Sequence, residues 1–330
     1  MLQRCDDAPV AGASVRAPRV CYAALSAPEA LARPGTLAVF GFGRQHAPLD
    51  DPRFLGVPLA GLDAQVPLEC WQVDGEVSHG WRGELRWAAG GGWLYAAVEL
   101  DEAAHGGPAG AARDAYALLH RFVATRPEHH VQRVWNYLDA INQGEGDAER
   151  YKAFCEGRAA GMGDFFAEGF PAATAIGHHG GDRRLQVYLL AASATGTRVE
   201  NPRQVSAWRY PRQYGRTPPS FARAMRLPAG DALAISGTAA VVGHASAHGG
   251  DLDAQLAETL TNLDALLASA GMPPGFDATA PLKVYLRHAS DAAGVRAHLA
   301  RQLPGVPLLL LEGDVCRREL LVEIDGWRYA

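Results

Sequence analysis

Short apolar or alternating runs dominate the first half of the chain, and their length and period are typical of β-strands. The strands predicted there comprise residues 20–25, 36–41, 67–73, 84–87, 93–100 and 131–138. The triplet Gly90-Gly91-Gly92 supplies permissive dihedrals for a hairpin turn between two of them. Helical spacing appears over residues 111–125, and a second helix is expected from about Asp147 to Arg158.

The second half repeats this order of elements. Its predicted strands comprise residues 184–190, 205–210, 232–242, 282–286 and two closing strands. The clearest helix spans residues 251–270, between an N-cap at Asp251 and a stop at Gly271, and another is expected at 291–303. Strands followed by helices, twice, predict an α+β protein of two domains, each a mixed β-sheet packed against helices. We place these domains at residues 1–155 and 156–330.

Composition excludes several classes of protein. With 36 acidic residues against 31 Lys and Arg, the net charge is -5, which argues against nucleic acid or an anionic membrane as a partner. The longest strongly apolar run, residues 306–311, is far shorter than the roughly 20 residues of a membrane helix. Charged residues interrupt the first twenty positions and leave no signal-peptide core, so a cytoplasmic protein is expected.

No common catalytic or metal-binding motif is present. The chain lacks a G-x-S-x-G elbow, a Walker A loop and an H-E-x-x-H helix. Five cysteines without a C-x-x-C pair argue against a disulfide framework and a cysteine zinc site. His244 and His248 have a helical spacing, but the glycines around them favour a loop. A metal site at these histidines stays open, but no other feature of the sequence supports one.

The segment from Arg209 to Arg223 is cationic, aromatic and rich in Pro and Gly, and it fits neither a strand nor an amphipathic helix. Solvated surface arginines are one interpretation. The other is an ordered loop that binds a small dicarboxylate, because guanidinium groups and phenol hydroxyls donate paired hydrogen bonds to carboxylates. Composition alone leaves both interpretations open.

Glu323 is the candidate acid. It lies in an otherwise apolar strand close to the end of the sequence, and it could face solvent on a half-exposed sheet. If it lies in a pocket instead, desolvation raises its pKa and suits the carboxyl to general-acid catalysis.

Six segments resemble the chorismatases, a family that includes the 3-hydroxybenzoate synthases. They are residues 133–142, 149–158, 170–177, 200–205, 210–223 and 236–239. The resemblance covers the chain from about residue 130 onward. A broader similarity to the RidA/YjgF fold, in residues 255–271, 283–286 and the Glu323 strand, implies that each half is a RidA-like unit, with the N-terminal one degenerate.

The resemblance implies cleavage of chorismate to hydroxybenzoate and pyruvate, with 3-hydroxybenzoate as the product and 4-hydroxybenzoate as a second product in one branch of the family. It assigns the catalytic acid to Glu323, which would protonate the enolpyruvyl ether. It assigns substrate contacts to Tyr151, Arg158, Tyr210 and Arg223. No metal or redox cofactor is implied.

Cys316 is the second catalytic candidate, because members that form hydroxybenzoate have a cysteine seven residues before the glutamate. A small buried residue is the simpler interpretation. On an unbroken strand Cys316 and Glu323 would face opposite sides, so a shared pocket requires a bulge or bend, for example at Arg317-Arg318.

Three other functions compete with this prediction. A hydrolase would leave a dihydroxycyclohexadienoate. A RidA-like imine hydrolase would need an arginine where Pro307 is followed by leucines. A non-catalytic RidA-like module would bind anions without turnover. Since two fused units can bury the surface that separate RidA-like subunits share, we expect a monomer.

Overall fold

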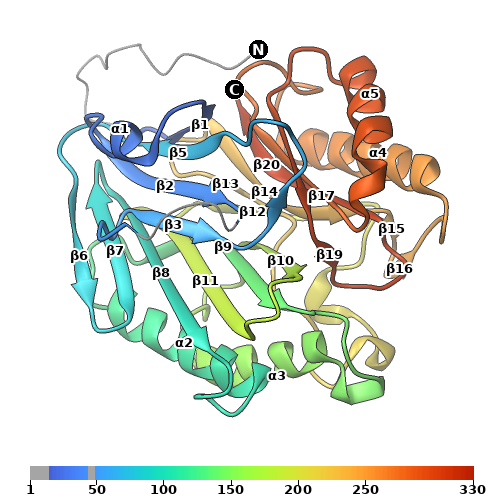
Figure 1. Cartoon of the computed structure of the whole chain (residues 1–330), viewed down its shortest axis with the longest axis horizontal. Helices are drawn as coiled ribbons and strands as arrows, with labels where there is room; N and C mark the ends of the chain where they lie inside the picture. The colour runs from blue at the N-terminus through green and yellow to red at the C-terminus, as the bar shows by residue number, and fades with distance from the viewer. Residues whose placement is uncertain (1–14, 44–48) are drawn as a thin grey trace.

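The computed structural model describes residues 15–43 and 49–330, which form three β-sheets around a shared interior with helices on the outside (Figure 1). The smallest sheet has four strands in the order β1-β5-β2-β3. Its elements are β1 (Arg19–Ala23), β5 (Leu68–Gln72), β2 (Thr36–Phe42), β3 (Phe54–Val57) and the short helix α1 (Ala27–Leu31).

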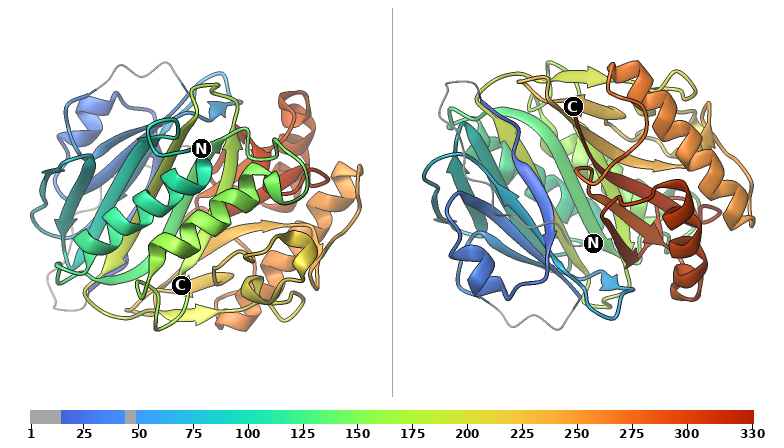
Figure 2. Two further views of the ribbon diagram at one scale, coloured as in Figure 1. Left: turned by 90° about the horizontal axis from the view of Figure 1, so that it is seen from below. Right: turned by 90° about the horizontal axis from the view of Figure 1, so that it is seen from above.

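The second sheet has seven strands in the order β19-β10-β9-β11-β8-β7-β6. These are β19 (Asp314–Val315), β10 (Ala172–His178), β9 (His130–Asp139), β11 (Arg184–Ala192), β8 (Trp93–Asp101), β7 (Leu85–Gly90) and β6 (Ser78–Arg82). Helices α2 (Pro108–Val123) and α3 (Arg150–Met162) cover its outer face (Figure 2). β9 and β10 are parallel, with α3 between them along the chain.

The third sheet also has seven strands, in the order β12-β13-β14-β20-β17-β18-β4. These are β12 (Thr197–Val199), β13 (Ala224–Arg226), β14 (Ala232–Ala239), β20 (Val322–Tyr329), β17 (Leu282–Leu286), β18 (Leu308–Glu312) and β4 (Ala60–Gly61). Helices α4 (Leu252–Ala270) and α5 (Ala292–Gln302) pack on its outer face. A two-stranded hairpin, β15 (Val241–Val242) and β16 (Ala245–Ser246), follows β14.

The α+β prediction is confirmed, and each large sheet carries two helices on one face, as expected of a RidA-like unit. The two halves also exchange edge strands. β4, from the N-terminal half, joins the third sheet, and β19, from the C-terminal half, joins the second. Residue 155, where the sequence suggests a boundary, lies inside α3, and the second sheet continues to Ala192. The chain passes from the second sheet to the third between the end of β11 at Ala192 and the start of β12 at Thr197.

The predicted strand at residues 205–210 is wrong. Residues Ala207–Arg209 form a short 3-10 helix, closed by hydrogen bonds from Arg209 N to Ser206 O (2.9 Å) and from Tyr210 N to Ala207 O (3.1 Å). The following Pro211 has no N–H to donate to a strand partner. Three cysteines of the described chain, Cys70, Cys155 and Cys316, are free thiols.

Aromatic side chains fill the interior between the three sheets. Phe40 and Trp71 come from the first sheet, Trp135 and Tyr188 from the second and Trp327 from the third. Trp135 stacks on Tyr188 with ring centroids 5.0 Å apart, and Trp71 contacts both Trp135 and Trp327.

Among the described residues, no helix combines the length and apolar character that a membrane crossing requires.

A buried charge network crosses this interior. Lys283 Nζ lies 3.0 Å from Glu69 Oε2 and 3.9 Å from Asp325 Oδ1, and Arg133 Nη2 lies 3.1 Å from Asp325 Oδ2. The four side chains are at most 1% exposed and come from all three sheets. Although burial by itself lowers the pKa of Lys283, the carboxylates of Glu69 and Asp325 raise it above its ordinary value. Lys283 therefore stays charged in the interior.

Candidate active site

The candidate site lies where β10 of the second sheet meets β14 and β20 of the third (Figure 1). An outer cavity opens toward solvent, and an inner one continues beneath it. The residues that line both comprise Tyr151, Pro219, Phe221, Gly237, Cys316 and Glu323. Five of the six residues predicted for the site line the outer cavity, and Arg158 lines the inner one.

Glu323 lies in β20, between Ala239 of β14 and Tyr285 of β17, and it is only 6% exposed. The interpretation of a solvent-facing glutamate is therefore wrong. Burial, followed by the charge of Asp325, raises the pKa of Glu323 to about 8. The carboxyl is thus protonated at neutral pH, the state that a general acid requires.

Gly237 makes room for this carboxyl. The register of β14 shifts between Ile235 and Thr238, which places Gly237 in a β-bulge facing Glu323. A Cβ at Gly237 would lie 1.9 Å from Oε1 of Glu323. A side chain here would displace the carboxyl, so the bulge and the glycine together set the position of the acid.

Arg158 lies in α3 and is 4% exposed, with its guanidinium 5.0 Å from the centroid of the Tyr116 ring. Its Nε and Nη2 have no hydrogen-bond partner among the described residues. The preceding Gly157 lets α3 approach α2, since a Cβ there would lie 1.9 Å from Ala109 O. Buried unpaired N–H groups on a cation suit a carboxylate ligand.

Arg223 and Tyr210 form a second group in the outer cavity whose chemistry suits an anion. Nη2 of Arg223 donates to the hydroxyl of Tyr210 (2.7 Å) and to Val205 O (2.9 Å). The buried Nε of Arg223 has no hydrogen-bond partner in the described chain. Only part of the predicted cationic loop lines the cavity. Its Arg212 and Arg216 are exposed and pair with Asp147 instead.

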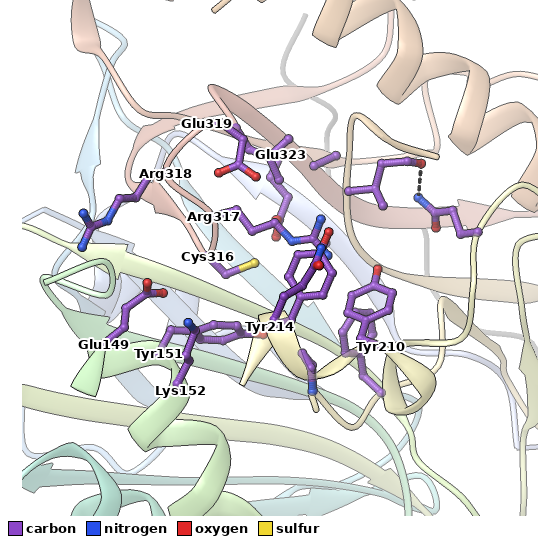
Figure 3. A pocket seen from close by; sticks show the side chains of 18 of the residues that line it. Glu149, Tyr151, Lys152, Tyr210, Tyr214, Cys316, Arg317, Arg318, Glu319 and Glu323 are labelled. Carbon is purple, nitrogen blue, oxygen red and sulfur yellow. Dashed lines mark hydrogen bonds between the residues drawn. The ribbon is translucent and has the colours of Figure 1, made fainter. Parts of the chain in front are cut away.

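Cys316 and Glu323 reach the same cavities because the chain between them is not a continuous strand. β19 ends at Val315, a turn follows with a hydrogen bond from Leu320 N to Arg317 O (3.1 Å), and β20 begins at Val322. The bend expected at Arg317-Arg318 lies in this turn. Tyr151 adjoins the thiol on the same side of the cavity (Figure 3).

Burial, then the nearby Glu323 carboxyl, raises the pKa of the Cys316 thiol to about 12. Burial also raises the pKa of the Tyr151 hydroxyl well above its ordinary value. Both groups are therefore neutral at physiological pH. A neutral thiol is a poor nucleophile, so Cys316 is suited to contact a reacting ring rather than to form a covalent intermediate.

The sequence analysis did not identify Arg317 as a site residue. Its guanidinium lies 3.9 Å from the ring centroid of Tyr214 and 5.0 Å from that of Tyr210, and its charge lowers the pKa of Glu323 (Figure 3). The sequence feature that could have identified Arg317 is its position directly after Cys316. Asn136 of the inner cavity was also not identified, although it lies in the segment 133–142 that resembles the chorismatases.

No metal-binding cluster of His, Cys, Asp and Glu occurs within residues 15–43 and 49–330. His244 and His248 lie in the loop region around β16, where Nδ1 of His244 is 3.4 Å from the Tyr214 hydroxyl and Nε2 of His248 is 3.2 Å from Glu258 Oε2.

Comparison with known proteins identifies the family. The family model described as chorismatase FkbO/Hyg5-like, N-terminal, matches residues 69–191. A 3-hydroxybenzoate synthase of Streptomyces hygroscopicus is 37% identical over 82% of this chain and 84% of its own. A chorismatase of the same species is 32% identical over 95% of both chains. A crystal structure of a chorismatase covers 95% of this chain and 98% of its own, at 30% identity and a TM-score of 0.85. The chain therefore belongs to the chorismatase family.

The raised pKa of Glu323 predicts a pH-dependent cost in stability. A carboxyl with an ordinary value of 4.5 and a folded value of about 8 makes the protein lose stability as pH rises from about 4.5 to about 8. Glu323→Gln removes this loss. We expect the variant to exceed the wild-type free energy of unfolding by roughly 3–5 kcal/mol at pH 9 and by less than about 1 kcal/mol at pH 5.

Denaturant unfolding at both pH values measures this difference, with Glu319→Gln, at an exposed carboxyl, as the matched control. An advantage of Glu323→Gln that is equal at pH 5 and pH 9 would contradict the raised pKa.

Proposed function

We propose that this protein converts chorismate to 3-hydroxybenzoate and pyruvate. The observation that carries the proposal is a buried carboxyl, Glu323, that holds its proton at neutral pH beside the neutral thiol of Cys316, in cavities that also contain two incompletely paired guanidinium groups. Membership of the chorismatase family and the 3-hydroxybenzoate synthase among its relatives support it.

The two carboxylates of chorismate require two cationic groups. Arg158 in the inner cavity and Arg223 with Tyr210 in the outer cavity supply them, and Glu323 and Cys316 line both cavities. Tyr151 lines both cavities. This arrangement holds the enol ether of a doubly charged substrate next to the acid, which lowers the barrier through orientation and charge complementarity.

Glu323 donates its proton to the methylene carbon of the enol ether, which creates an oxocarbenium centre. Addition of water to this centre leads to release of pyruvate, and loss of the neighbouring ring hydroxyl as water makes the ring aromatic. One water enters and one leaves, so the products together have the composition of chorismate and no oxidant is needed. Glu323 is left as a carboxylate, which the adjacent charges of Arg223 and Arg317 stabilise.

Cys316 supports the hydroxybenzoate branch over simple hydrolysis. The resemblance implies that members which only hydrolyse chorismate lack this cysteine, and here its thiol lines both cavities with Glu323. A RidA-like imine hydrolase is disfavoured, because β18, where an arginine would be needed, contains only leucines and Glu312.

The proposal predicts that the purified protein forms hydroxybenzoate and equimolar pyruvate from chorismate. Glu323→Gln cannot donate the proton, so we expect kcat/KM to fall by about 10²–10⁴-fold or more. Chromatography beside authentic standards measures the products, and a lactate dehydrogenase assay measures pyruvate. Tight binding of chorismate by the wild-type protein without turnover would instead favour the non-catalytic module.

Cys316→Ala tests whether the thiol directs the reaction to hydroxybenzoate rather than to simple hydrolysis. We expect pyruvate release to continue, because Glu323 is intact, while 3-hydroxybenzoate falls and a dihydroxycyclohexadienoate rises. Cys155→Ala, which removes a second thiol from the inner cavity, is the control and should retain the hydroxybenzoate product. An unchanged ratio of 3-hydroxybenzoate to dihydroxycyclohexadienoate in Cys316→Ala would contradict the proposed role of the thiol in forming hydroxybenzoate.

We also propose that the chain acts as a monomer, because its three sheets bury their shared interior within one chain. Sedimentation equilibrium should give the single-chain mass of 35.1 kDa. A concentration-independent mass of two or three chains would contradict this.

A further inference from the structure

The charge network of the interior reaches the active site through one hydroxyl group. Thr174 lies in β10, is 2% exposed, and lines the inner cavity. Its Oγ1 donates to Asp325 Oδ2 (2.8 Å) and accepts from Arg133 Nη2 (2.5 Å). The same oxygen accepts from the backbone N–H of Gly237 (2.9 Å), so β9, β10, β14 and β20, four strands of two sheets, meet at this atom.

Gly237 is the residue against which the Glu323 carboxyl lies. A Cβ at Gly237 would be 1.9 Å from Oε1 of Glu323 and 3.3 Å from Oγ1 of Thr174. The Thr174 hydroxyl and the Glu323 carboxyl therefore adjoin the same bulge. Because a hydroxyl has a single proton, donation to Asp325 directs the oxygen lone pairs toward Gly237 and Arg133.

We propose that Thr174 and Asp325 are positioning residues for the general acid: Asp325 orients the Thr174 hydroxyl, which holds the Gly237 amide and so fixes the place of the Glu323 carboxyl. This inference rests on the proposed role of Glu323. Asp325 itself is 0% exposed, and its Oδ2 also accepts from Arg133 Nη2 (3.1 Å), Trp135 Nε1 (3.0 Å) and the Tyr285 hydroxyl (3.0 Å), so four donors with Thr174 fix its orientation.

Asp325 also acts on the proton of Glu323 through its charge. Both residues lie on the inner face of β20, two positions apart, and the Asp325 carboxylate raises the pKa of Glu323. The other ionisable groups that act on or face Glu323 are Arg133, Arg223, Arg317, Tyr151 and Cys316. β14 contributes no ionisable side chain, and the nearest from β17 are Tyr285, its register partner, and Lys283.

Thr174→Val keeps the shape of the side chain but removes the acceptor of the Gly237 N–H. We expect kcat on chorismate to fall about 10- to 100-fold, because small displacements of a reacting group are costly, while KM stays unchanged. Thr174→Ser restores the hydroxyl and should restore kcat. Thr238→Val is the matched control, since this buried hydroxyl of the same bulge bonds only to Ser236 O (3.0 Å) among described atoms.

Asp325→Asn tests the charge. Removing the carboxylate lowers the pKa of Glu323, so the decline of kcat/KM at high pH should move to lower pH by about one unit. A purely structural role would lower thermal stability and leave this pH profile in place. If Asp325→Asn does not fold, the Thr174 variants decide the question through the split between kcat and KM.

Wild-type kcat in a folded Thr174→Val, equal losses in Thr174→Val and Thr238→Val, or an unmoved pH profile in a folded Asp325→Asn would overturn the inference. Failure of the proposed function has a different signature, because the wild-type protein itself would then not turn over chorismate.

Discussion

Four buried charges hold the three sheets of this protein in one arrangement. Lys283 and Asp325 belong to the third sheet, Glu69 to the first and Arg133 to the second, and each has an opposite charge within reach. Charges removed from water are stable only when they are paired, so a sheet that moved away would leave an unpaired charge in an aromatic interior. The sheets can therefore approach one another in few ways, and the cavity between β10, β14 and β20 has a defined shape.

The same exclusion of water gives Glu323 its chemical character. In water a glutamate is ionised at neutral pH and cannot serve as an acid. Here the surrounding strands remove the solvation that favours the carboxylate, and Asp325 adds a second unfavourable charge, while Arg133, Arg223 and Arg317 limit the effect. The burial that costs the protein stability at this position also keeps the Glu323 carboxyl protonated, which is the state that the proposed general acid requires.

Local sequence patterns predicted much of the fold, and the family resemblance predicted six side chains that line the two cavities, but neither predicted how the three sheets assemble. Helical spacing identified α2 and α4, because their apolar faces repeat over several turns. The two-residue strands β4 and β19 have no period to detect. Partners such as Glu69 and Lys283 are far apart in the sequence, and no local pattern connects them.

The exchange of β4 and β19 between the two large sheets affects the order in which the protein can fold during its synthesis. The second sheet gains its last strand only when Asp314 and Val315 have been synthesised, long after β11, and the third sheet depends on a strand contributed near residue 60. Such distant pairings raise the contact order, which slows folding. On the ribosome, neither half can complete its sheet before the other is present, so the catalytic cleft forms as a late and collective event rather than by the docking of two finished domains.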